Sequence, residues 1–184
     1  MRVTEEKFKR ISLAEPNQWE LHAGRPRRKP LMIFAHNEVA WMIGVALWDQ
    51  LGVEAYVIRV DAGLVRRSES TYYIPDVMVI PRGEARRLFP DPNTWEVYPD
   101  PLPLVVEIWS PSTGRYDVTD KLGEYQRRGD HEIWFLHPVE RTLTTWRRQS
   151  DGSHVEQIYR GGTVEPASLS NVRINLDDIF RRLE

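Results

Sequence analysis

The feature that most constrains the fold is a series of short apolar segments, rich in β-branched and aromatic residues, that is interrupted by segments of helical periodicity. Apolar side chains in residues 35–51 recur every three or four positions, which predicts a helix with one buried face. His36 or Asn37 could cap the start of this helix, and Gly52 would end it. The other predicted helices are residues 84–88, 116–128 and 176–183.

The apolar segments between these helices have the length of strands and are bounded by turn residues. They lie at residues 54–60, 72–80, 102–109, 132–137, 142–147 and 155–159. The last two flank the turn sequence Ser150-Asp-Gly-Ser153 and are expected to form a hairpin. This order of elements predicts one α/β or α+β domain over residues 1–184, with a central sheet and flanking helices.

Composition excludes several classes of protein. The chain has no cysteine, so a disulfide scaffold, a zinc finger, an iron–sulfur site and thiol catalysis are excluded together. The net charge of −2 argues against a protein that coats nucleic acid by charge alone. No apolar run approaches the roughly 20 residues of a membrane-spanning helix, and no signal-peptide core is present, so we expect a cytoplasmic protein without membrane contact. The sequence has no glycine-rich phosphate-binding motif, so a nucleotide cofactor is not implied.

Two acidic residues, Asp76 and Glu107, lie inside apolar strand segments. A buried carboxylate is costly unless a cation or hydrogen-bond donors meet it. Each acid, taken alone, is explained by a place near a strand end, exposed or paired to an arginine. If the two strands are neighbours in register, however, the carboxylates would stand roughly 5 Å apart and a divalent cation could lie between them. Oxygen ligands without cysteine favour Mg²⁺ or Mn²⁺ over zinc.

Lys121 is a third candidate, because this chain uses arginine for 21 of its 25 cations. Asp117 and Lys121 are four residues apart on a predicted helix, which is the spacing of an ordinary surface ion pair. Alternatively, the Lys121 ammonium lies over the two carboxylates, where it would orient a water molecule or neutralise charge in a transition state. Tyr125 continues the same helix face.

Two weaker candidates concern phosphate contacts. The basic run of residues 25–29 could hold backbone phosphates, or it could be a solvated loop. His36 could approach a phosphate, although a solvated histidine at the start of a helix is the simpler interpretation.

Four segments carry a resemblance to a known bacterial family. These are Ile74-Pro-Asp-Val-Met-Val79, Val105-Val-Glu-Ile-Trp-Ser-Pro-Ser-Thr113, Asp117-Val-Thr-Asp-Lys121 with Tyr125, and Gly129-Asp-His-Glu-Ile-Trp-Phe-Leu-His-Pro138. Together they resemble the Uma2 family, which is similar to PD-(D/E)xK nucleases. The resemblance implies a restriction-endonuclease-like fold over nearly the whole chain.

The resemblance also implies roles for individual residues. Asp76 and Glu107 resemble the two acidic Mg²⁺ ligands, and the backbone carbonyl of Ile108 would be a further ligand. The usual lysine position, two residues after the glutamate, is occupied by Trp109, so Lys121 would supply the lysine from the following helix. Glu20 resembles the acidic residue that such folds often contribute from an N-terminal segment, although Glu20 could equally be an outward acid in a packing segment.

These observations lead to the hypothesis of a metal-dependent endonuclease that hydrolyses phosphodiester bonds of nucleic acid, DNA in the first place. The alternative is a non-catalytic nucleic-acid-binding or scaffold module with the same fold. Aromatic residues outside the helix at 35–51 are candidates for a homodimer face.

Overall fold

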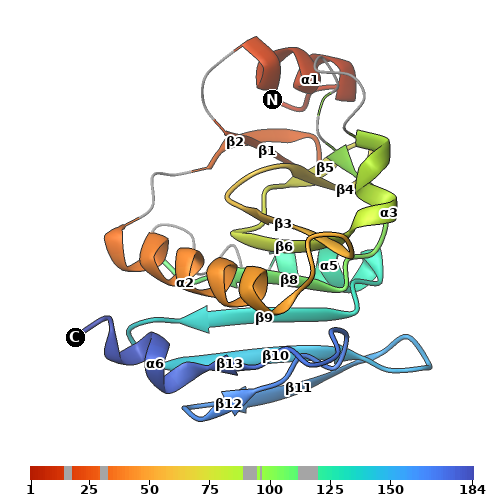
Figure 1. The fold of residues 1–184 in the computed structure, drawn as a ribbon. Coiled ribbons are helices and arrows are strands. Elements are labelled where there is room, and N and C mark those ends of the chain that lie inside the picture. Colours follow the sequence, from red (N-terminus) through yellow and green to blue (C-terminus); the bar gives the residue numbers. More distant parts are fainter. Residues whose placement is uncertain (15–17, 30–32, 89–94, 96, 112–119) are drawn as a thin grey trace.

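A computed structural model describes residues 1–14, 18–29, 33–88, 95, 97–111 and 120–184, and its main layers are two sheets with helices around them (Figure 1). The central sheet has six strands in the order β11-β10-β9-β8-β6-β3. Their bounds are β3 Tyr56–Val60, β6 Val77–Pro81, β8 Leu104–Ile108, β9 Glu132–His137, β10 Thr142–Arg148 and β11 His154–Tyr159. The sheet is mixed, because β8 and β9 are parallel and the other neighbours antiparallel.

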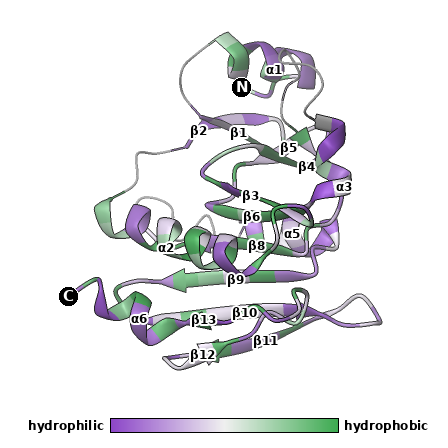
Figure 2. Cartoon of the chain, viewed as in Figure 1, coloured by the Kyte–Doolittle hydropathy of each residue, from purple (hydrophilic) through white to green (hydrophobic). Residues whose placement is uncertain are grey.

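One face of the central sheet packs against α2 (Phe34–Gln50) and α6 (Leu176–Arg181). Alternate strand residues such as Val79, Val106 and Leu136 share this core with Ile43 and Leu47 of α2. Figure 2 shows β6 and β8 mostly in the colours of hydrophobic residues, as expected for strands buried on both faces. Asn175 caps α6 by accepting from the amides of Asp177 and Asp178.

The opposite face packs against α5 (Leu122–Arg128) and against a second sheet of five strands, in the order β2-β1-β5-β4-β7. The strands of this second sheet are β1 Trp19–His22, β2 Arg25–Arg28, β4 Leu64–Ser68, β5 Thr71–Tyr73 and β7 Val97–Tyr98. Helix α1 (Glu5–Ala14) adds Phe8 to the outer core of this sheet. The shorter elements are α3 Arg82–Ala85, a 3₁₀ turn at Arg86–Leu88, β12 Thr163–Val164 and β13 Ile174–Asn175.

The predicted architecture, a central mixed sheet flanked by helices, is confirmed. Most predicted helices and strands lie within a few residues of their observed positions, and Gly129 ends α5 in a left-handed conformation with φ 81°. The part of the predicted helix that precedes Asp120 lies outside the described residues. In the described part of the chain, no helix has the length and apolar character needed to cross a membrane.

Three local predictions were wrong. The predicted strand 72–80 is two strands, β5 and β6, which belong to different sheets. Pro75 lies between them and has no N–H for a sheet hydrogen bond, so the chain changes sheets there. The basic run is strand β2 rather than a loop, since β1 supplies its backbone partners. Helix α2 begins at Phe34 after Ile33, without a side-chain cap, so neither His36 nor Asn37 caps it.

Candidate active site

The structure brings Asp76 and Glu107 together on neighbouring strands. Strands β6 and β8 are antiparallel, with Val77 opposite Val106. Continued by one residue, this register places Asp76 opposite Glu107, as the sequence predicted for strands in register. Both side chains are buried, and the Asp76 carboxylate accepts a hydrogen bond from the Ile108 amide at 2.7 Å.

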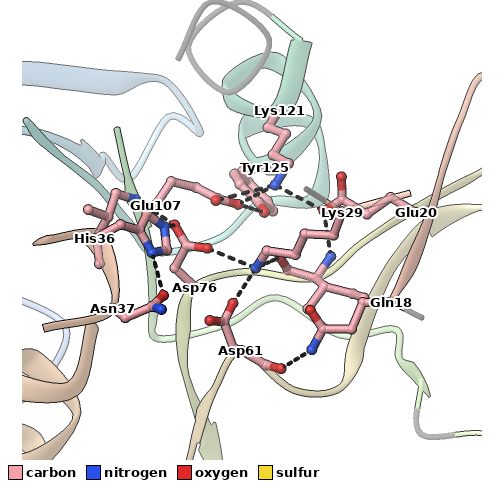
Figure 3. Close-up of polar contacts among 12 residues, drawn as sticks. Gln18, Glu20, Lys29, His36, Asn37, Asp61, Asp76, Glu107, Lys121 and Tyr125 are labelled. Atoms are coloured by element: carbon pink, nitrogen blue, oxygen red, sulfur yellow. Dashed lines mark hydrogen bonds and ion pairs between the residues drawn. The ribbon is translucent and has the colours of Figure 1, made fainter. Parts of the chain in front are cut away.

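The Asp76 carboxylate is held on both oxygens by side chains that are distant in the sequence (Figure 3). Lys29 Nζ lies 2.8 Å from Oδ1, and His36 Nε2 donates to Oδ2 at 2.9 Å. Burial by itself would raise the pKa of Asp76, but the charge of Lys29 and the hydrogen bond from His36 outweigh it. The pKa of Asp76 therefore lies well below its ordinary value, and the carboxylate is ionised at neutral pH.

Lys29 is the central cation of this part of the site. Its Nζ contacts Asp61 Oδ1 and the carbonyl oxygen of Ile74 in addition to Asp76, and its side chain is 3% exposed. Burial opposes the charged form of Lys29, whereas Asp76, Asp61 and Glu107 favour it. The net effect raises the pKa of Lys29 above its ordinary value, so this buried lysine is an ammonium ion.

A second ion pair lies beside the first. Lys121 precedes α5, and its Nζ lies 3.1 Å and 3.3 Å from the two carboxylate oxygens of Glu107 and 2.9 Å from Glu20 Oε1. The hydroxyl of Tyr125 also donates to Glu107. Burial first, and then the charge of Glu107, raise the pKa of Tyr125 well above its ordinary value, so the hydroxyl keeps its proton.

Glu20 joins this cluster from β1 in the second sheet. Its Oε1 accepts a hydrogen bond from the amide of Ile74 at 2.9 Å, next to the point where the chain passes from β5 to β6. The side chain is buried rather than outward-facing. Glu20 thus links the second sheet to Lys121 and positions this lysine against Glu107.

The four side chains that the sequence singled out, Asp76, Glu107, Lys121 and Glu20, therefore lie in one buried cluster. Lys121 does not face solvent, and Asp117, its proposed surface partner, lies outside the described residues. Lys29 and His36 also belong to the cluster, and their predicted environments were wrong. Lys29 was assigned to a phosphate-binding or solvated run, and His36 to a solvated helix end, whereas both are buried against Asp76.

The charges and donor atoms of the cluster fit a divalent metal ion. Four carboxylates, those of Glu20, Asp61, Asp76 and Glu107, face the two ammonium groups of Lys29 and Lys121. A surplus of two negative charges remains when His36 is neutral. In the described ranges no three His, Asp or Glu side chains are arranged to hold a metal by themselves. Mg²⁺ sites, however, commonly use one or two carboxylates, with water or substrate phosphate as the remaining ligands.

Comparisons with known proteins agree with this fold. A family model described as "Uma2: Putative restriction endonuclease" matches residues 5–177. The crystal structure of a putative nuclease belonging to DUF820 from Anabaena variabilis matches with a TM-score of 0.78 and 17% sequence identity, over 99% of each chain. At this identity the likeness shows that the two chains share a fold. No curated protein matches the chain.

Proposed function

The chain belongs to the Uma2 family, and from this premise we propose that it is a metal-dependent endonuclease that hydrolyses phosphodiester bonds of nucleic acid, with DNA as the first substrate to test. The observation that carries the proposal is the convergence of Asp76, Glu107 and Lys121, two carboxylates and one ammonium group, in a single buried cluster. A structural core has no need of two adjacent carboxylates, because replacing buried ion pairs by apolar side chains is often neutral or stabilising.

Asp76 and Glu107 would hold Mg²⁺ or Mn²⁺, together with the backbone carbonyl of Ile108. When bound, such an ion lowers the pKa of a water ligand and polarises the phosphate. Asp76 is suited to this role because it stays ionised, and because His36 and the Ile108 amide fix the direction of its Oδ2. Its Oδ1 contacts only Lys29 among the described groups, so a cation would share or replace that contact.

Lys121 supplies the positive charge on the other side of the cluster. Its ammonium group would position the attacking water and stabilise the additional negative charge of the phosphoryl transition state. Glu20 and Glu107 hold the ammonium group in place, while Tyr125 keeps Glu107 oriented through a hydroxyl that remains protonated. These three contacts preorganise the lysine before substrate binds.

Two arginines of β2, Arg25 and Arg27, are exposed. Arg27 lies opposite Glu20 in the β1–β2 register, so the basic strand borders the strand that reaches Lys121. We assign these two arginines to contacts with backbone phosphates, which would place the scissile group over the acid cluster.

The test is a nicking assay on supercoiled plasmid with Mg²⁺, with Mn²⁺ and with EDTA. Wild type should nick only with metal, and Asp76→Asn and Glu107→Gln should reduce nicking to background. Lys121→Met should lower the rate about 10²–10³-fold, as expected for a lost electrostatic contact to the transition state. Asp49→Asn, on the exposed surface of α2, is the matched control and should retain activity. Nicking by Asp76→Asn at the wild-type rate would assign the activity to a contaminant.

One observation favours the alternative of a non-catalytic module with the same fold. Asp76 already has a cationic or hydrogen-bonding partner on each oxygen, so this carboxylate is compensated within the chain. Calorimetric titration with Mn²⁺ separates the two functions. One bound ion that is lost in Asp76→Asn supports the endonuclease, whereas no binding and no nicking in wild type support the module.

A further inference from the structure

A pocket of about 230 Å³ lies over the outer strands of the central sheet, and Glu107 forms part of its wall. Strands β8 to β11 supply its floor, and we call it the β8–β11 pocket. Its side walls include Trp109, His137 and Trp146. Because Glu107 also pairs with Lys121, the pocket adjoins the proposed active site directly.

The strand register explains how the pocket leads away from Glu107. Glu107 lies opposite Phe135, Phe135 opposite Thr144, and Thr144 opposite Ile158. Side chains paired in register stand on the same face of a sheet. At about 4.8 Å between strands, this row extends roughly 14 Å from Glu107 to the edge strand β11. The row has a buried end at Glu107 and an exposed end at Ile158.

Aromatic rings dominate the walls. Trp109 stacks on His137 with ring centroids 4.1 Å apart and an interplanar angle of 20°. Phe135 and Trp146 form an edge-to-face pair at 5.1 Å, and the Trp146 indole N–H donates to Glu156 at 2.9 Å. Flat aromatic surfaces beside a phosphodiester-cleaving site are suited to stacking on nucleobases. The volume is smaller than the roughly 300–1,000 Å³ of pockets for drug-sized ligands, so one heterocyclic ring fits better than a larger molecule.

The charges of the pocket indicate which part of a nucleotide enters it. Glu107, Glu140 and Glu156 line it, and its lining contains no lysine or arginine among the residues that the structure describes. A phosphate would be repelled by Glu140 and Glu156, whereas the N–H groups of a base could donate to these two carboxylates. The sugar–phosphate backbone therefore has to stay outside, on the side of Lys121.

We propose that the β8–β11 pocket binds one unpaired nucleobase next to the scissile phosphodiester, so that the substrate is single-stranded or locally unpaired nucleic acid. This inference rests on the proposed function and specifies its substrate class. A base inside a paired duplex is covered by its neighbours and cannot stack on the aromatic rings of the pocket without leaving the helix. A strand with free bases enters the pocket without that cost.

The test is the binding of fluorescein-labelled 12-nucleotide strands, followed by fluorescence anisotropy in EDTA so that no cleavage occurs. The ligands are single-stranded DNA, single-stranded RNA of the same sequence, the corresponding duplex DNA, and a strand in which abasic sites replace the bases. Wild type should bind at least one single strand more tightly than the duplex and the abasic strand. The comparison of single-stranded DNA with single-stranded RNA shows which of the two nucleic acids supplies the bound base.

Trp109→Ala should weaken binding of the preferred single strand about 5- to 150-fold, as expected for loss of one stacked base. Trp41→Ala is the matched control, because Trp41 is an exposed tryptophan on α2, distant from this face of the sheet. Equal affinity for the abasic strand, or equal losses in the two variants, would overturn the proposal. So would a dimer in size-exclusion chromatography that Trp109→Ala converts to monomer, because a second copy would then cover the pocket.

The result is distinguishable from a failure of the nuclease proposal. If wild type binds single strands through their bases but with Mg²⁺ or Mn²⁺ cleaves neither the plasmid nor the single strand that it prefers, the pocket assignment stands and the catalytic assignment fails. If wild type nicks plasmid with metal but binds the abasic strand equally well, only the pocket assignment fails.

Discussion

Replacing Lys29 by methionine tests whether the site depends on a buried cation that is distant in the sequence. Methionine keeps an unbranched apolar chain of similar size but removes the ammonium group that contacts Asp76, Asp61 and the Ile74 carbonyl. Removing one partner of a buried ion pair typically costs about 3–5 kcal/mol, because the other charge stays buried. Asp61 is partly exposed and can regain water, and the methionine buries apolar surface, so we expect a loss near the lower limit, about 3 kcal/mol.

The measurement is urea unfolding at pH 7, followed by tryptophan fluorescence and circular dichroism. Lys9→Met is the matched control, because Lys9 is exposed on α1, and its free energy of unfolding should change by no more than about 0.5 kcal/mol. A loss below about 1 kcal/mol in Lys29→Met would refute the reasoning, since Asp76 would then not rely on this ammonium group.

The same variant makes a second, opposite prediction in the presence of metal. Without Lys29 the cluster carries one more negative charge, so Mn²⁺ should bind more tightly and should stabilise Lys29→Met more than wild type. Equal or smaller stabilisation of the variant by Mn²⁺ would show that Lys29 does not compete with a cation for Asp76.

Three further perturbations test other parts of the structure. Tyr125→Phe removes the hydroxyl that donates to Glu107, so it should lower the free energy of unfolding by about 1–3 kcal/mol and slow nicking. An unchanged midpoint of urea unfolding would contradict that contact. Gly44→Ala would place a Cβ 2.7 Å from Val60 Cγ2, between α2 and β3. It should therefore lower the free energy of unfolding by about 1–3 kcal/mol, measured by thermal unfolding. Gly83→Ala is the control, because the space around its Cβ is open and its free energy of unfolding should change little. The pKa of Asp151 lies below its ordinary value because Ser153 donates to its carboxylate through both the hydroxyl and the backbone amide. This contact therefore stabilises the folded protein at pH values above the pKa that Asp151 has in the unfolded chain. The stabilisation is lost as the pH falls through the lower pKa of the folded state. Ser153→Ala should therefore raise this pKa in an NMR titration.

The elements that the sequence predicted are those whose pattern is local. Helix α2 and strands β8 to β10 carry strong apolar segments, because each packs against a continuous core. The four-residue strands β1 and β2 were missed, since segments such as Arg25-Pro-Arg-Arg28 have no strand pattern and become a strand only through pairing with β1. Likewise, the apolar pattern of residues 72–80 does not show that this segment forms two strands, β5 and β6, that belong to different sheets.

The residues of the candidate site likewise include some that the sequence identified and some that it did not. Asp76 and Glu107 were identifiable because an acid within an apolar strand is unusual. Lys121 was a candidate because lysine is scarce in this chain, and Glu20 followed from a family resemblance. Lys29 carried a signal that was available but too weak to use. The chain has only four lysines, and the two outside α1, Lys29 and Lys121, are the two that the fold buries beside carboxylates.

The sequence by itself determined that two acidic residues lie within apolar strand segments, where a buried carboxylate would require compensation. Only the tertiary structure decided which groups provide it. Lys29 and His36 precede Asp76 by 47 and 40 residues, and each reaches its carboxylate from a different element. Electrostatic energy depends on the distance between charges in space and on their exclusion from water, and neither quantity can be obtained from positions along the chain.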